Sequence, residues 1–171
     1  RISMHIYRFS STVKSPISAP LMSFPKFTDQ DYDPCGMTAL YDAIGTVLQR
    51  FRDSKNKTVL VIATDGEENS SKEYTLEAIQ TKLKAKQECG WSIVYLSETL
   101  ATKQQGACLG VKNNHNVSTG PQSLHKMMRN THLNNAIHFA CMDGGEREFE
   151  SAITRCHGNK NNMWLTSELI D

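Results

Sequence analysis

Long apolar runs and an excess of charge of one sign are both absent from this sequence. No apolar stretch approaches the length that a membrane-spanning helix needs. Residues 1–9 alternate polar with apolar side chains, so they lack the continuous apolar centre of a signal peptide. The formal net charge is +1, which gives no global field to attract nucleic acid or an anionic membrane. We therefore expect neither a nucleic acid nor a membrane as partner.

Cysteine motifs are missing as well. The five cysteines are odd in number and widely scattered, at Cys35, Cys89, Cys108, Cys141 and Cys156. A chain of 171 residues can bury a core without disulfides, so we expect reduced thiols in a cytoplasmic protein. No Cys-x-x-Cys pair and no helical histidine pair stands at zinc-ligand spacing, and no feature marks an activated thiol. We interpret the cysteines as small buried hydrophobic residues.

Repeats and low-complexity tracts are also absent, and what the sequence does contain is an alternation of helix and strand patterns. Period-two alternation and β-branched runs predict strands over residues 2–9, 57–63 and 91–96, while helical spacing of apolar residues predicts helices over 38–51, about 71–88 and 99–109. The prolines between residues 15 and 34 confine that segment to an edge strand and loops. The almost unbroken apolar run 57–63 is typical of a central parallel strand. Together these elements predict an α/β fold with a doubly wound, mostly parallel open sheet and helices on both faces.

The helix and strand pattern weakens after Leu96, although the length favours a single domain. We assign residues 1–110 to the core, and residues 111–171 to the C-terminal part of the same domain or to an extension with one or two helices. Residues 111–120 are expected to be a loop. Scattered helical spacing covers 123–139, and clearer spacing over 149–156 predicts a last helix. Trp164 and Leu165 are expected to dock on the body.

Two loops rich in oxygen donors flank the most regular elements, at residues 34–38 and 64–71. The second follows the carboxyl end of a predicted buried strand, where open α/β sheets bind their ligands. Hydroxyl and carboxylate oxygens suit a hard cation, magnesium first and calcium or manganese as alternatives. Asp65 would supply the charge that Thr38 cannot, and Gly36 and Gly66 would let the backbone turn tightly beside the site.

Each of these residues also has a purely structural interpretation. Thr38 can be the N-cap of the helix that follows it, with Asp42 as an exposed charge of the first turn. Glu67 and Glu68 fit a solvated turn that caps the next helix better than they fit a metal site. The lysines Lys82, Lys84 and Lys86 are interpreted as a solvated helix face.

Two segments resemble signature segments of von Willebrand factor A domains. Residues 36–45, Gly-Met-Thr-Ala-Leu-Tyr-Asp-Ala-Ile-Gly, resemble the family's threonine-bearing segment, and residues 61–69, Val-Ile-Ala-Thr-Asp-Gly-Glu-Glu-Asn, resemble its aspartate-bearing segment. The resemblance covers about residues 1–100. The sequence of residues 64–71, Thr-Asp-Gly-Glu-Glu-Asn-Ser-Ser, and the later Gly90-Trp91 pair are similar to those of short bacterial and phage members of this family.

The resemblance implies a metal-ion-dependent adhesion site, with Thr38 and Asp65 as metal ligands and one coordination position left for a partner's carboxylate. The family's third segment, Asp-x-Ser-x-Ser, is not in this sequence, and residues 2–9 resemble the family's second strand. We expect the first strand and its helix to lie upstream of Arg1, because their loss would leave an unpaired strand edge in the core. The alternative is that the protein lacks them.

Three functions are compatible with these patterns. The leading hypothesis is a protein-binding module, not an enzyme, whose magnesium ion bridges Thr38 and Asp65 to an acidic group of a partner protein. The second is a metal-free scaffold of the same fold in a phage or viral assembly, with contacts made by residues 100–171. A metal-dependent hydrolase is least favoured, because no general base is paired with a nucleophile.

Overall fold

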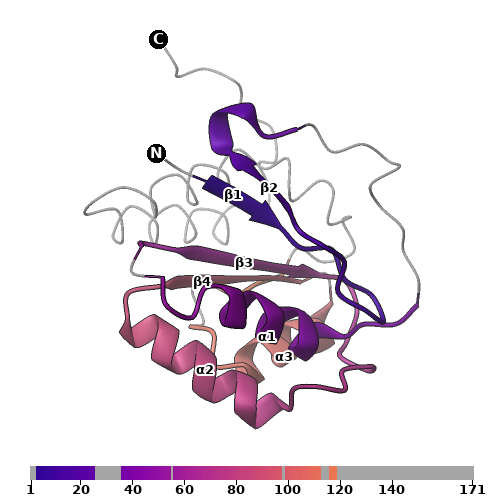
Figure 1. Cartoon of the computed structure of the whole chain (residues 1–171). Coiled ribbons are helices and arrows are strands. Elements are labelled where there is room, and N and C mark those ends of the chain that lie inside the picture. The colour runs from indigo at the N-terminus through magenta and orange to yellow at the C-terminus, as the bar shows by residue number, and fades with distance from the viewer. Residues whose placement is uncertain (1–2, 26–35, 55, 98, 113–115, 119–171) are drawn as a thin grey trace, which may run out of the picture.

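A computed structural model of the chain describes residues 3–25, 36–54, 56–97, 99–112 and 116–118. Its elements, in chain order, are β1 (Ser3–Ile6), β2 (Ile17–Pro20), the short 3-10 helix η1 (Leu21–Ser23), α1 (Leu40–Arg50), β3 (Val59–Thr64), α2 (Leu76–Glu88), β4 (Ser92–Ser97), α3 (Leu100–Cys108) and β5 (Asn116–Ser118). Strands and helices alternate from α1 to β5 (Figure 1). The predicted α/β class is confirmed.

The described strands form two separate sheets. β3, β4 and β5 make a parallel sheet in the order β3-β4-β5. β1 and β2 make an antiparallel pair, in which Ser3 lies opposite Pro20 and Ile6 opposite Ile17. The described strands therefore do not include an extended doubly wound sheet. The expectation that the strand near residues 57–63 is central is also wrong for this sheet, because β4 is its middle strand and β3 is at its edge.

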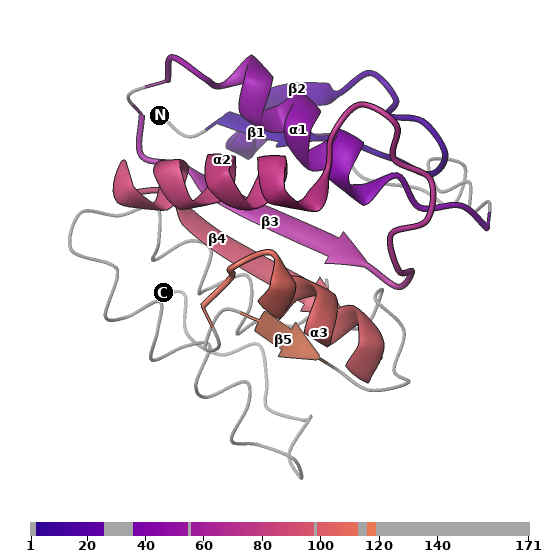
Figure 2. The ribbon, with the colours of Figure 1, turned by 90° about the horizontal axis from the view of Figure 1, so that it is seen from below.

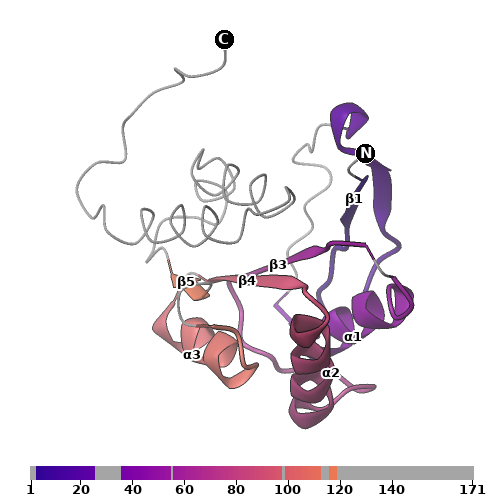
Figure 3. The ribbon, with the colours of Figure 1, turned by 90° about the vertical axis from the view of Figure 1, so that its left-hand side faces the viewer.

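All three described α-helices lie on the same side of the β3-β4-β5 sheet (Figure 3). α2 connects β3 to β4 and α3 connects β4 to β5, so two consecutive β-α-β units run in one direction. The predicted second layer of helices is not among the described elements. None of the described helices is long and apolar enough to cross a membrane.

The core lies between this sheet and the helices. Ile62 of β3 is in register with Tyr95 of β4, and both belong to the main apolar cluster. The buried members of that cluster are Leu40, Ile44, Leu48, Ile62, Ile79, Leu83, Trp91, Ile93, Tyr95, Leu109 and Val111. Val94 and Leu96, which alternate with Tyr95 along β4, are also fully buried. β4 is thus the strand that is covered on both faces, as its continuous apolar sequence requires.

α2 begins later than the sequence predicts. Its first residue is Leu76, and the Thr75 hydroxyl accepts the N-cap hydrogen bond from an amide of the first turn. Residues 71–74 form a non-helical segment before it, and their amides donate to the carboxylates of Glu68 and Asp42. Its end is as predicted, with Gly90 at a φ of 86° just beyond the last turn.

The shorter predicted elements have mixed outcomes. α3 confirms the helix expected over residues 99–109, and β2 confirms an edge strand in the proline-containing segment. Residues 111–120 are not wholly a loop, because 116–118 form β5 and pair with the end of β4. The expectations for residues 123–139 and 149–156, and for Trp164 and Leu165, lie outside the described residues.

The cysteines are not all buried. Cys89 and Cys108 are free thiols, and both are exposed at the C-terminal ends of helices. Our interpretation of the cysteines as buried hydrophobic residues is therefore wrong at these two positions. The other three cysteines lie outside the described ranges.

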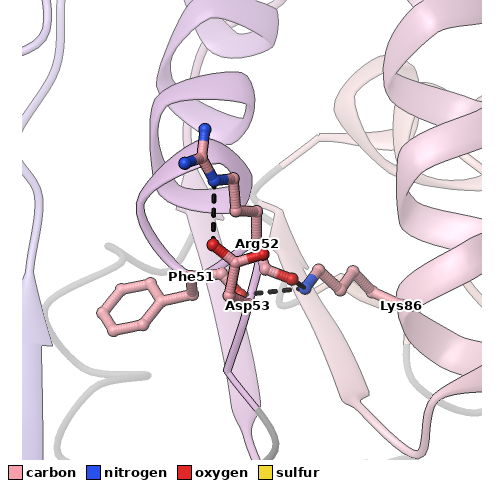
Figure 4. A network of polar contacts seen from close by, with 4 residues as sticks. All are labelled: Phe51, Arg52, Asp53 and Lys86. Carbon is pink, nitrogen blue, oxygen red and sulfur yellow. Dashed lines mark hydrogen bonds and ion pairs between the residues drawn. The ribbon is translucent and has the colours of Figure 1, made fainter.

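Lys86 is not part of a solvated face, although Lys82 and Lys84 are exposed as expected. Its ammonium group donates to the carbonyl oxygens of Phe51, at 2.9 Å, and of Arg52, at 2.8 Å, just past the end of α1 (Figure 4). It also lies 4.7 Å from the centroid of a Trp91 ring. Lys86 therefore supplies positive charge where the α1 dipole is negative and ties α1 to α2.

Candidate functional site

The structure brings the two predicted loops into contact. Thr38 lies just before α1, and Asp65 and Gly66 directly follow β3. A methyl group added at Gly66 would lie 2.5 Å from the Thr38 hydroxyl oxygen, so the Thr38 side chain rests against the Gly66 backbone. The contact is at the carboxyl-end rim of the parallel sheet, where β3 ends and α1, α2 and α3 begin (Figure 2).

Backbone and side-chain hydrogen bonds hold the two loops together. The Thr38 amide donates to Asn69 Oδ1 at 2.9 Å, and the Asn69 amide donates back to the Thr38 carbonyl at 3.0 Å. Within the second loop, the Thr64 hydroxyl donates to the Gly66 carbonyl at 3.0 Å and accepts from the Gly66 amide at 3.2 Å. Thr38 and the residues after β3 therefore form one hydrogen-bonded unit.

Glu68 is the main anchor of this unit. Its carboxylate accepts hydrogen bonds from the amides of Tyr41, Ser70 and Ser71 at 3.0, 2.8 and 2.7 Å, and from the Ser71 hydroxyl at 2.6 Å. Burial raises the pKa of the Glu68 carboxyl, but these donors outweigh burial and hold the pKa below its ordinary value. Glu68 is thus an ionised, internally satisfied carboxylate that caps the start of α1 from another segment.

Asp42 makes the reciprocal connection from α1 to the second loop. Its carboxylate accepts from the amides of Lys72, Glu73 and Tyr74 at 2.8 to 3.0 Å, while its own amide donates to the Ser71 hydroxyl at 3.1 Å. Partial burial raises the pKa of Asp42, but the three amides outweigh it and lower the pKa overall. The segment before α2 is consequently fastened to α1 before it reaches its own helix.

These contacts correct three of the structural interpretations made from the sequence. Thr38 is not the N-cap of α1, since that position is Ala39 and carries no side-chain capping bond. Asp42 is not an isolated exposed charge, because it binds three amides. Glu68 caps α1 and not α2, whose N-cap is Thr75; only Glu67 is exposed as expected.

Gly36 and Gly66 both lie where the backbone bends. Neither has a positive φ, which among the described glycines only Gly90 and Gly110 have. Gly66 is required for the close approach of Thr38, because a Cβ would collide with its hydroxyl. Gly36 has nothing within 4 Å of the corresponding position.

Thr38 and Asp65 retain unused oxygen atoms. Asp65 is exposed, and no described residue donates a hydrogen bond to its carboxylate. No described residue is hydrogen-bonded to the Thr38 hydroxyl, which is half-buried against Gly66. Neither predicted ligand is therefore committed to an internal hydrogen bond among the described residues, whereas the Asp42 and Glu68 carboxylates are already bonded to backbone amides. In the described ranges, however, no group of three or more His, Cys, Asp or Glu side chains could hold a metal ion.

Gln105 is a site-associated residue that sequence reasoning missed. Its side-chain carbonyl accepts from the Glu68 amide at 2.6 Å, and its side-chain amide donates to the Tyr95 hydroxyl at 2.7 Å. No signal in the sequence distinguishes it from the other polar residues of α3.

Comparison of the chain with protein-family models, with curated protein sequences and with solved structures finds no match.

Proposed function

We propose that the chain is a protein-binding module of the von Willebrand factor A type, with the doubly wound sheet of that family. In this proposal a divalent cation at Thr38 and Asp65 engages an acidic group of a partner protein. The observation that carries the proposal is the contrast among three carboxylates at the rim, those of Asp42, Asp65 and Glu68. The carboxylates of Asp42 and Glu68 accept hydrogen bonds from several backbone amides. Asp65 is exposed, precedes the Gly66 that contacts the Thr38 hydroxyl, and accepts no hydrogen bond from a described residue.

The donor set fits magnesium better than zinc. A hydroxyl and a carboxylate are hard oxygen ligands, and magnesium commonly keeps several waters while binding one or two protein oxygens. Two protein ligands leave coordination positions for water, for a partner's carboxylate and for ligands of the kind that the family carries in its Asp-x-Ser-x-Ser segment. One carboxylate leaves a bound divalent ion with net positive charge, which favours an acidic group on the partner.

Titration of the full chain with Mn2+, followed by electron paramagnetic resonance of the free ion, tests the metal site. We expect saturable Mn2+ binding that Mg2+ competes away and EDTA reverses. Asp65→Ala should abolish it and Thr38→Ala should weaken it, whereas Glu67→Ala should not change it, because Glu67 is a neighbouring exposed carboxylate outside the Thr38 contact. Equal losses in Asp65→Ala and Glu67→Ala would mean nonspecific attraction to acidic side chains.

Acetate is a suitable probe for the partner's group. With Mn2+ bound, water-proton relaxation should slow when acetate replaces a coordinated water, and the change should be missing in Asp65→Ala. Unaltered relaxation in the wild-type protein would contradict the acidic-partner part of the proposal.

A metal-free scaffold is the alternative function. The observation that favours it is that the described residues contain no larger cluster of possible ligands. Absence of Mn2+ binding in the wild-type chain, together with assembly that persists in EDTA, would establish this alternative.

A further inference from the structure

Gln105 joins the loop after β3 to the centre of the sheet. It lies on α3, and its side chain bonds the Glu68 amide on one side and the Tyr95 hydroxyl on the other. Glu68 and Gln105 are 37 residues apart in the chain, so this bond is a tertiary contact between two separate β-α connections. It acts on the same loop that carries Asp65.

Tyr95 is a rigid anchor for this bridge. Its residue exposure is 0%, and it is in register with Ile62 on the adjacent strand. Burial raises the pKa of Tyr95 to about 12, although the hydrogen bond from Gln105 lowers it, so the hydroxyl stays protonated at neutral pH. Gln105 is therefore held by a group that neither moves freely nor changes charge.

α3 has few other means of holding the loop. Its fully buried residues are Thr102 and Gly106, which are small, and Leu100 at its start is 72% exposed. Apolar burial of the helix itself is thus limited, and the paired hydrogen bonds of Gln105 provide its directional contact with the Glu68 backbone.

We propose that Gln105 is a positioning residue, which fixes the loop over residues 64–71 relative to β4 and so sets where Asp65 stands at the rim. The part of this role that concerns a ligand rests on the function proposed above. Gln105 itself contacts no ligand in this scheme; it acts through the Glu68 backbone.

Amide hydrogen exchange tests the loop-anchoring step without any ligand. Gln105→Ala should speed exchange of the Glu68 amide about tenfold, the effect of losing one good hydrogen bond, while β4 amides keep their protection. Gln104→Ala is the matched control, because Gln104 is the exposed neighbour on the same helix and makes no described contact with the loop. Identical exchange of the Glu68 amide in the two variants would overturn the proposal.

Mn2+ binding to the same full-length variants distinguishes positioning from a merely structural role. Gln105→Ala should weaken Mn2+ binding about five- to tenfold when it is measured well below the melting temperature, where the chain is fully folded. Gln105→Glu should restore it, because its carboxylate can accept from both the Glu68 amide and the Tyr95 hydroxyl. Tyr95→Phe should give an intermediate loss. Wild-type affinity in Gln105→Ala would reject the positioning role while leaving the metal site standing.

A wild-type chain that binds no Mn2+ would reject the proposed metal site and, with it, the ligand-positioning role. The exchange experiment would then still decide whether Gln105 anchors the loop. Failure of the function and failure of this inference are thus separate results.

Discussion

The Glu68 carboxylate accepts a hydrogen bond of 3.0 Å from the Tyr41 backbone amide, although 27 residues separate the two in the chain. Tyr41 lies in the first turn of α1, where backbone amides have no partner within the helix. A carboxylate from the loop after β3 therefore takes the place of a local N-cap side chain, which Ala39 cannot supply. The start of α1 and the candidate site are consequently a single structural unit.

Replacement of Glu68 should destabilise the protein more than replacement of its neighbour. Glu68→Gln keeps the size but removes the charge and some of the acceptor capacity, and we expect a loss of about 1–2 kcal/mol in the free energy of unfolding. Glu67→Gln, at an exposed position, should be neutral within about 0.5 kcal/mol. Urea unfolding followed by circular dichroism measures both, and equal effects would contradict the capping role of Glu68.

Stability should fall in acid because of Asp42 and Glu68. Their ordinary pKa values are 3.8 and 4.5, and folding lowers both, because amide donors outweigh the opposing effect of burial. A lowered folded-state pKa means that the unfolded chain takes up protons first, so this stability is complete above the ordinary pKa and is lost as pH falls through the folded value. Urea unfolding between about pH 6 and pH 3 should show the decline below about pH 4.5. The double variant Asp42→Asn, Glu68→Gln should show a flatter slope, and an unchanged slope would disprove the assignment.

The contact between Gly66 and Thr38 predicts a specific effect of adding one methyl group. In Gly66→Ala the new Cβ would lie 2.5 Å from the Thr38 hydroxyl oxygen, so Thr38 or the loop must shift. We expect a destabilisation of about 1–3 kcal/mol, and Mn2+ binding that is weaker than in the wild-type chain. Gly36→Ala is the control, because it meets nothing within 4 Å. Thermal melting of both variants gives the comparison, and a stable Gly66→Ala protein with normal Mn2+ binding would show that the close approach is dispensable.

Lys86 should matter to stability where Lys84 does not. Lys86→Met keeps an apolar stem but removes the donors to the Phe51 and Arg52 carbonyls, and we expect a loss of about 1 kcal/mol. Lys84→Met, at an exposed position of the same helix, should have little effect. Chemical denaturation in low and high salt measures the difference. Similar midpoints for the two variants would mean that the α1 end needs no positive charge.

Elements with a clear apolar period could be predicted from the sequence. α1, β3, β4 and α3 all lie close to their expected residues, because local side-chain pattern and tertiary burial favour the same conformation there. α2 begins at Leu76 and not near residue 71, because the amides of residues 72–74 bind Asp42 in a tertiary contact that no local pattern indicates. β5 was missed because three residues carry too little periodicity.

The approach of the two loops could be predicted from the sequence, but the residues that support them could not. The resemblance of two segments to one family predicts that Thr38 lies near the loop of Asp65, and the structure shows contact between Thr38 and Gly66 of that loop. The roles of Glu68 and Gln105 were not predictable, because a carboxylate or amide in a polar segment has the same sequence pattern whether it is solvated or bonded to a distant backbone group. Such partners are decided by the fold.

The hydrogen bonds that tie the loop after β3 to α1 and α3 join residues between 27 and 37 positions apart. Closing loops of that length costs chain entropy that no local contact repays, so these bonds form only when α1, β3 and α3 are already docked. The rim is therefore ordered together with the domain. The contact between Thr38 and Gly66 then forms in the same cooperative step as the native core.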